Sequence, residues 1–135
     1  MTSARLLLVL TATLAASACS NDSATPVSPT LPTTSFTFNT SITAGGTATR
    51  TFQQFVDGGV AMTLTSVTPD VPLGIGIGIP TNAGGACSLT RALVTTAGSS
   101  PQITITAERG TWCVRVWETG AVDERVSFSL AVTHH

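Results

Sequence analysis

The sequence predicts an all-β protein: a single β-sandwich, jelly-roll-like, of about eight short antiparallel strands. From Phe36 onward, apolar and polar residues alternate over short runs, which is typical of half-buried strands. Clusters of Gly, Pro, Asp and Asn separate these runs and predict tight turns. The same region lacks the apolar period of an amphipathic helix. An immunoglobulin-like sandwich is the nearest alternative.

Each expected strand is a run of alternating residues, and each ends at a turn-forming cluster. In chain order, the strands are expected near residues 35–42, 47–56, 59–67, 73–79, 87–95, 101–107, 111–118 and 125–133. The clearest turn sequences are AGG at 44–46, DGG at 57–59, TPDVP at 68–72, NAGG at 82–85 and AGSSP at 97–101.

Alternation within three of these strands predicts which side chains fill the core. The expected core residues are Val60, Met62, Leu64, Trp112, Val114, Val116, Val126, Phe128, Leu130 and Val132. Because successive side chains of a strand point to opposite faces, Cys113, Arg115 and Trp117 are expected on the outer face of theirs.

Residues 1–18 have the layout of a secretory signal peptide. Arg5 precedes an apolar run over residues 6–14, and small residues follow up to Cys19. Ala16-Ser17-Ala18 resembles the lipobox of bacterial lipoproteins, in which the following cysteine is lipidated and begins the mature chain. The resemblance implies a lipid anchor at Cys19, and a soluble secreted protein is the alternative.

The cysteine count agrees with lipidation. The chain has three cysteines, and an odd number in an exported protein leaves one thiol to explain. If Cys19 carries lipid, Cys87 and Cys113 remain as a pair that an oxidising compartment would bond.

Residues 19–34 are rich in Ser, Thr and Pro and are expected to form an extended tether. The folded domain then comprises residues 35–135. Ser20 occupies the position where an aspartate favours inner-membrane retention in enterobacterial lipoproteins. We therefore expect an exported protein of the bacterial envelope, attached to the outer membrane or the cell surface.

Composition argues against several functions. The formal net charge is −1 and the chain has no lysine, so no nucleic-acid partner is expected. The only histidines are His134 and His135, at a terminus expected to fray. Histidine-dependent nucleophilic catalysis needs a rigidly held histidine, so we expect neither an enzyme nor a cofactor.

The segment LGIGIGIP at residues 73–80 has one apolar face and one face without side chains. Leu73, Ile75, Ile77 and Ile79 are expected to be buried. Each glycine in a strand costs roughly 0.5–1 kcal/mol relative to alanine, so something should compensate. We expect Trp117 to cover Gly76 or Gly78, as aromatic residues cover sheet glycines elsewhere.

The alternative is that Gly74, Gly76 and Gly78 form a shallow groove for a ligand or another strand. Arg115 and Trp117 would then complete a face suited to a sugar or an acidic peptide.

Three carboxylates cluster near one predicted turn: Glu118, Asp123 and Glu124. A solvated turn is the simpler interpretation, and a surface calcium site is the weaker alternative. No other metal site is expected.

The segment GTWCVRVWETGAVDERVSFSLAVTHH resembles the last two strands of bacterial pre-peptidase C-terminal (PPC) domains, and FQQFVDGGVAMTLTS is similar to their entry strands. The matching positions are Gly110, Trp112, Val114, Val116, Gly120, Phe128, Leu130 and Val132. The resemblance covers residues 35–133. It implies a small jelly-roll-like sandwich of a kind usually appended to secreted enzymes.

Together these features predict a non-catalytic, lipid-anchored envelope protein that acts as a structural or interaction module. The alternative is a carbohydrate- or peptide-binding module that uses the Trp117 and Arg115 face.

Overall fold

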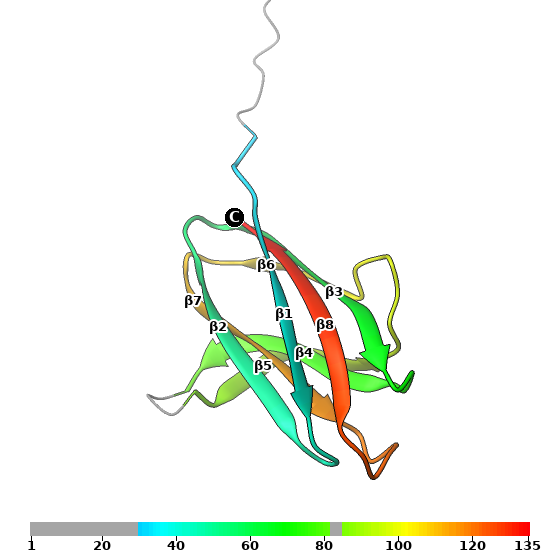
Figure 1. The fold of residues 1–135 in the computed structure, drawn as a ribbon. Helices are drawn as coiled ribbons and strands as arrows, with labels where there is room; N and C mark the ends of the chain where they lie inside the picture. The colour runs from blue at the N-terminus through cyan, green and yellow to red at the C-terminus, as the bar shows by residue number, and fades with distance from the viewer. Residues whose placement is uncertain (1–29, 82–84) are drawn as a thin grey trace, which may run out of the picture.

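The computed structural model describes residues 30–81 and 85–135, which form eight strands (Figure 1). The strands are β1 (Thr34–Ile42), β2 (Thr47–Gln54), β3 (Gly58–Thr68), β4 (Leu73–Pro80), β5 (Cys87–Thr95), β6 (Ile103–Ala107), β7 (Gly110–Glu118) and β8 (Val126–His134). Each matches a strand expected from the sequence. The described residues include no helix long and apolar enough to cross a membrane.

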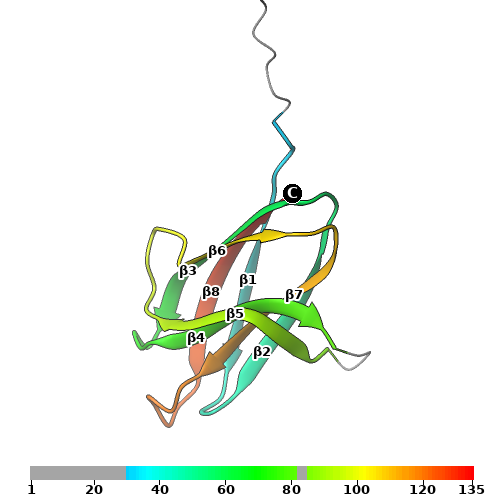
Figure 2. The same cartoon turned by 180° about the vertical axis from the view of Figure 1, so that it is seen from behind.

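The strands form two four-stranded sheets, seen from opposite sides in Figures 1 and 2. Their orders are β1-β8-β3-β6 and β2-β7-β4-β5. The pairs β1–β8, β2–β7, β3–β6 and β4–β5 are all antiparallel, so the first half of the domain pairs with the second half in reverse order. This is the wrapped ribbon of a jelly roll, which confirms the expected fold class. It differs from the seven- or nine-stranded immunoglobulin arrangement.

The core lies between the two sheets and contains the residues that alternation predicted. All of the predicted core side chains of β3, β7 and β8 are buried, and they form one cluster with Leu73, Ile75 and Ile77 of β4. Ile79 was also expected in the core, but it is 45% exposed. The pairing of β4 with β7 ends at Gly78, so Ile79 extends beyond that strand and pairs only with Ser88 of the edge strand β5.

The C-terminus is held in the sandwich, so the expectation of fraying was wrong. His134 pairs with Thr34 of β1 and is buried, with its ring centroid 4.8 Å from that of Phe52. The backbone N–H of His135 donates to Oε1 of Gln54 at 3.2 Å. The carbonyl of His135 accepts a hydrogen bond from the N–H of Phe55 at 3.0 Å.

Trp117 does cover a glycine of β4, but not one of the two expected. Gly74 is the register partner of Trp117, and a Cβ added to Gly74 would overlap the indole. The prediction that Trp117 covers a glycine of β4 is therefore confirmed, but the covered residue is Gly74 and not Gly76 or Gly78. The sequence does not fix the register of β4 on β7, and this register selects the glycine that the indole covers.

The other two glycines are covered by β5. A Cβ on Gly76 would lie 2.9 Å from Cδ1 of Leu89. A Cβ on Gly78 would overlap the backbone carbonyl of Ser88. The bare face of β4 is thus filled by the protein's own chain, which is contrary to the alternative of a glycine groove.

A bulge brings β5 over β4. Ile77 pairs with Arg91 and Gly78 pairs with Leu89, so Thr90 is an extra residue on β5. An extra residue on one strand bends that strand and increases its local twist. The beginning of β5 consequently folds over the outer face of β4.

The predicted disulfide between Cys87 of β5 and Cys113 of β7 is confirmed. These strands are not neighbours, because β4 lies between them. Strands two apart in a flat sheet are separated by about 9–10 Å, whereas the Cα atoms of the two cysteines are only 5.9 Å apart. The bond therefore closes over β4 at Gly78, the register partner of Cys113.

Replacing Gly78 with Ala should lower the free energy of unfolding by about 1–3 kcal/mol, the usual cost of overpacking. The added Cβ meets the backbone of Ser88, which cannot rotate away as a side chain can. Gly59→Ala is the matched control, because Gly59 also lies in a strand and a Cβ added there would have nothing within 4 Å. It should leave stability unchanged or raise it slightly. Urea unfolding of both variants decides the point, and equal effects would contradict the crossing.

Candidate functional site

The outer face of the β2-β7-β4-β5 sheet carries a hollow of about 520 Å³. We call it the Arg115 pocket. Its lining residues are Thr47 and Thr49 of β2, Arg115 of β7, and Gly85, Ala86 and Cys87 at the beginning of β5 and just before it. The pocket is thus bounded by β2, by β7 and by residues 85–87, which the disulfide ties to β7.

The pairing of β2 with β7 positions the polar side chains of the pocket. Thr49 is the register partner of Arg115, and Thr47 is the partner of Trp117. Residues two apart in a strand share a face, so both threonines lie on the outer face with Arg115. The disulfide of Cys87 fixes the opposite boundary.

Arg115 is half-buried, and its Cζ lies 6.0 Å from the centre of the Trp117 ring. Other arginines form hydrogen bonds with the protein: Arg50 donates to the carbonyl of Thr37, and Arg125 donates to Oγ of Ser41. Within residues 30–81 and 85–135, the Arg115 guanidinium has no such bond.

The structure brings together only part of the binding face that the sequence suggested. Arg115 lines the pocket, whereas Trp117 lies over Gly74 and is not part of the lining. Gly76 and Gly78 are covered by β5 and are not part of it either.

Sequence reasoning missed Thr47, Thr49 and the segment at residues 85–87. The alternation of β2 marks both threonines as outward-facing. Only the long-range register of β2 on β7 shows that they flank Arg115.

Glu118 has a structural role in place of the weakly expected calcium site. Its side chain is buried, and Oε2 accepts hydrogen bonds from the N–H groups of Gly45 at 2.9 Å and Gly120 at 2.8 Å. Oε1 accepts from the N–H of Ala121 at 2.7 Å. The carboxylate thereby joins the β1–β2 turn to the loop between β7 and β8.

The three carboxylates named from the sequence do not gather into a site. Asp123 and Glu124 are exposed, while the oxygens of Glu118 face backbone N–H groups. In the part of the chain that the structure describes, no group of three His, Cys, Asp or Glu side chains could hold a metal ion.

Hydrogen bonds hold the pKa of Glu118 below its ordinary value of 4.5. The bond from Gly45 has the largest effect, the bonds from Gly120 and Ala121 add to it, and burial opposes them. Donors that face a carboxylate favour its charged form.

The two histidines lie away from the Arg115 pocket. The ring of His134 packs against Phe36 and Phe52, and Nδ1 of His135 lies 3.3 Å from the carbonyl of Pro32. Neither residue lines the Arg115 pocket.

No protein-family model matches this chain, and no curated protein matches it. Among solved structures, the chain is similar to Aeromonas hydrophila PliG, a periplasmic lysozyme inhibitor of g-type lysozyme. The two chains are 18% identical, the likeness covers 73% of this chain and 83% of that one, and the TM-score is 0.43. The comparison does not assign this chain to a family.

Replacing Glu118 with Gln should lower the melting temperature at pH 7, because an amide nitrogen would then face backbone donors. The folded-state pKa of Glu118 is lowered, so its contribution is present above pH 4.5 and is lost as the pH falls through the folded-state pKa. The difference between the parent and Glu118→Gln should therefore shrink in acid. Glu124→Gln, at an exposed position, should show neither effect. Thermal melts from pH 7 to pH 2 test this, and a pH-independent difference would contradict it.

Proposed function

We propose that this protein is a non-catalytic, lipid-anchored module of the bacterial cell envelope that binds an acidic peptide segment through the Arg115 pocket. The main support for this proposal is the Arg115 side chain. Its guanidinium is half-buried, has no hydrogen bond to the described residues, and lines an open hollow beside the hydroxyls of Thr47 and Thr49.

The chemistry of the pocket favours a carboxylate. A guanidinium presents a planar fork of donors that matches a carboxylate with two parallel hydrogen bonds. The hydroxyls of Thr47 and Thr49 can donate to or accept from a neighbouring peptide group. An Asp or Glu side chain, or a chain terminus, supplies both features in one ligand.

The position of Trp117 favours a peptide over a sugar. Sugar-binding faces generally offer an aromatic ring as a flat apolar platform. Trp117 is half-buried over Gly74 and is not part of the pocket lining, so the pocket lacks this platform. Glycan binding is the second candidate, and it is favoured only by the Arg115–Trp117 contact.

Several features support an envelope location. The signal-peptide layout and Cys19 suggest export and lipidation. The Cys87–Cys113 bond suits an oxidising compartment, where disulfides persist. The jelly-roll topology is also compatible with the proposed PPC-like relationship.

We infer that the protein is non-catalytic from where its ionisable groups lie. His134 is buried among aromatic rings, and Glu118 is engaged by backbone donors. Neither is positioned to act on a ligand in the Arg115 pocket.

Replacing Arg115 with Ala should weaken acidic-peptide binding about tenfold to a hundredfold, since hydrogen bonds to charged groups contribute about 1.5–3 kcal/mol. Arg91→Ala is the matched control, because Arg91 is exposed on β5 and does not line the pocket. An array of acidic peptides beside an array of acidic glycans provides the measurement. Binding to glycans alone, or equal losses in both variants, would contradict the peptide proposal.

Replacing Cys19 with Ser should prevent attachment of fatty acid and move the protein to the soluble fraction. Metabolic labelling with a fatty-acid analogue, followed by membrane fractionation, tests the anchor. Ser20→Ala serves as the control and should remain labelled. Unlabelled parent protein in the soluble fraction would refute lipidation.

A further inference from the structure

Three of the five large apolar residues that are exposed in the described chain lie at one end of the sandwich. They are Phe55, which is 63% exposed, Val56, which is 38% exposed, and Leu31, which is 43% exposed. We call these three residues the apolar end. Neighbouring apolar residues exposed together generally mark a surface that contacts another phase or molecule.

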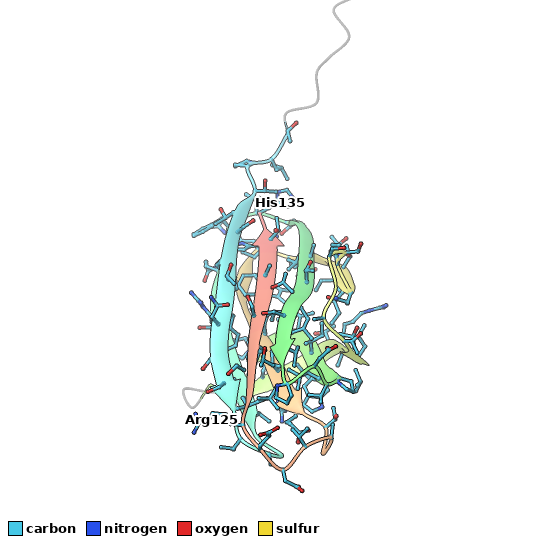
Figure 3. The ribbon with its side chains drawn as sticks, turned by 45° about the vertical axis from the view of Figure 1, so that its right-hand side comes forward. Arg125 and His135 are labelled. Atoms are coloured by element: carbon cyan, nitrogen blue, oxygen red, sulfur yellow. A yellow bond between two sulfur atoms is a disulfide. The ribbon has the colours of Figure 1, made fainter. Side chains whose placement is uncertain are left out.

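Contacts with His135 place these residues at the same end of the sandwich. His135 accepts a hydrogen bond from the N–H of Phe55 at 3.0 Å, and its Nδ1 lies 3.3 Å from the carbonyl of Pro32, which follows Leu31. Figure 3 shows His135 at the end where the chain enters β1, and Arg125 at the opposite end.

The protein holds the β2–β3 turn that carries Phe55 and Val56 firmly. Gln54, just before the turn, is buried and accepts a hydrogen bond from the N–H of His135. Asp57, just after it, accepts a hydrogen bond from the N–H of Arg109 at 2.6 Å. The two apolar side chains are therefore displayed by a fixed turn, although neither joins the core cluster.

We propose that the apolar end rests on the lipid surface of the membrane that holds Cys19. This inference rests on the proposed lipid anchor. Residues 20–33 join Cys19 to β1, a distance that covalent geometry limits to about 50 Å. The tether enters at the apolar end, as Figure 1 shows, so this is the end that the anchor draws toward the bilayer.

The charges around the apolar end identify the type of contact. Asp57, Glu108 and Arg109 are exposed there and do not form a basic patch. The contact is therefore an insertion of apolar side chains among the headgroups, and it does not depend on anionic lipid. In this orientation the Arg115 pocket lies on a sheet face at the side of the sandwich.

The test uses full-length lipidated protein in phosphatidylcholine vesicles whose acyl chains carry bromine, a quencher of indole fluorescence. Phe55→Trp places a reporter at the apolar end. Glu124→Trp is the matched control, because Glu124 is exposed and adjoins Arg125 at the opposite end. Trp112 and Trp117 fluoresce in both variants, so the quenching of the parent protein is measured as the background. After this background is subtracted, we expect brominated lipid to quench the Phe55→Trp reporter at least threefold more strongly than the Glu124→Trp reporter.

A second arm uses the unlipidated Cys19→Ser protein and measures its partition onto the same vesicles. Adding Phe55→Ser and Val56→Ser should lower this partition about tenfold, and raising the salt concentration should change it little. Thermal melts establish that the triple variant is folded, and the reporter experiment does not depend on that variant.

The possible results distinguish the lipid contact of the apolar end from the lipid anchor at Cys19. Fatty-acid labelling at Cys19 with equal quenching at both reporters overturns the lipid contact and leaves the anchor intact. A Phe55-dependent dimer in analytical ultracentrifugation also overturns it, because the occupant of the apolar end is then a second copy of the chain. Absence of the fatty-acid label overturns the anchor, and the inference with it.

Discussion

The structure depends on one crossing, where the beginning of β5 passes over Gly78 of β4 and is tied to β7 by the Cys87–Cys113 bond. Any side chain on Gly78 would occupy the space of the Ser88 backbone. The bond has a sequence separation of 26, for which restriction of the unfolded chain stabilises the fold by about 3–4 kcal/mol. That is comparable to the combined cost of three strand glycines, roughly 0.5–1 kcal/mol each.

The same crossing creates the Arg115 pocket. The beginning of β5 covers Gly76 and Gly78, which leaves no room for the alternative of a glycine groove. Residues 85–87 bound a separate hollow against β2 and β7. Trp117 covers Gly74, so Arg115 is left as the charged group of the hollow. Covering the β4 glycines thus uses Trp117 and residues of β5, and Arg115 is the residue of this outer face that lines the pocket.

Local pattern predicted the strands and the core apart from Ile79, because alternation and turn residues are properties of short segments. The disulfide was predicted from the number of cysteines in an exported chain. Local pattern was insufficient where one strand meets another. The extra residue Thr90 shifts β5 on β4, and this shift decides that Leu89 and Ser88 cover two of the glycines. Likewise, Gln54 lies far from the C-terminus in sequence, yet its side chain holds His135 in place. The roles of Thr47, Thr49 and Glu118 also come from contacts between distant segments.

The most direct test of the crossing is amide hydrogen exchange of the full chain before and after reduction of its disulfide. We predict that the amides of residues 86–90 lose far more protection than those of β8, because reduction frees the beginning of β5 from the sheet while the core between the sheets remains. An equal loss of protection in both segments, or no loss at residues 86–90, would show that the disulfide does not hold β5 over β4.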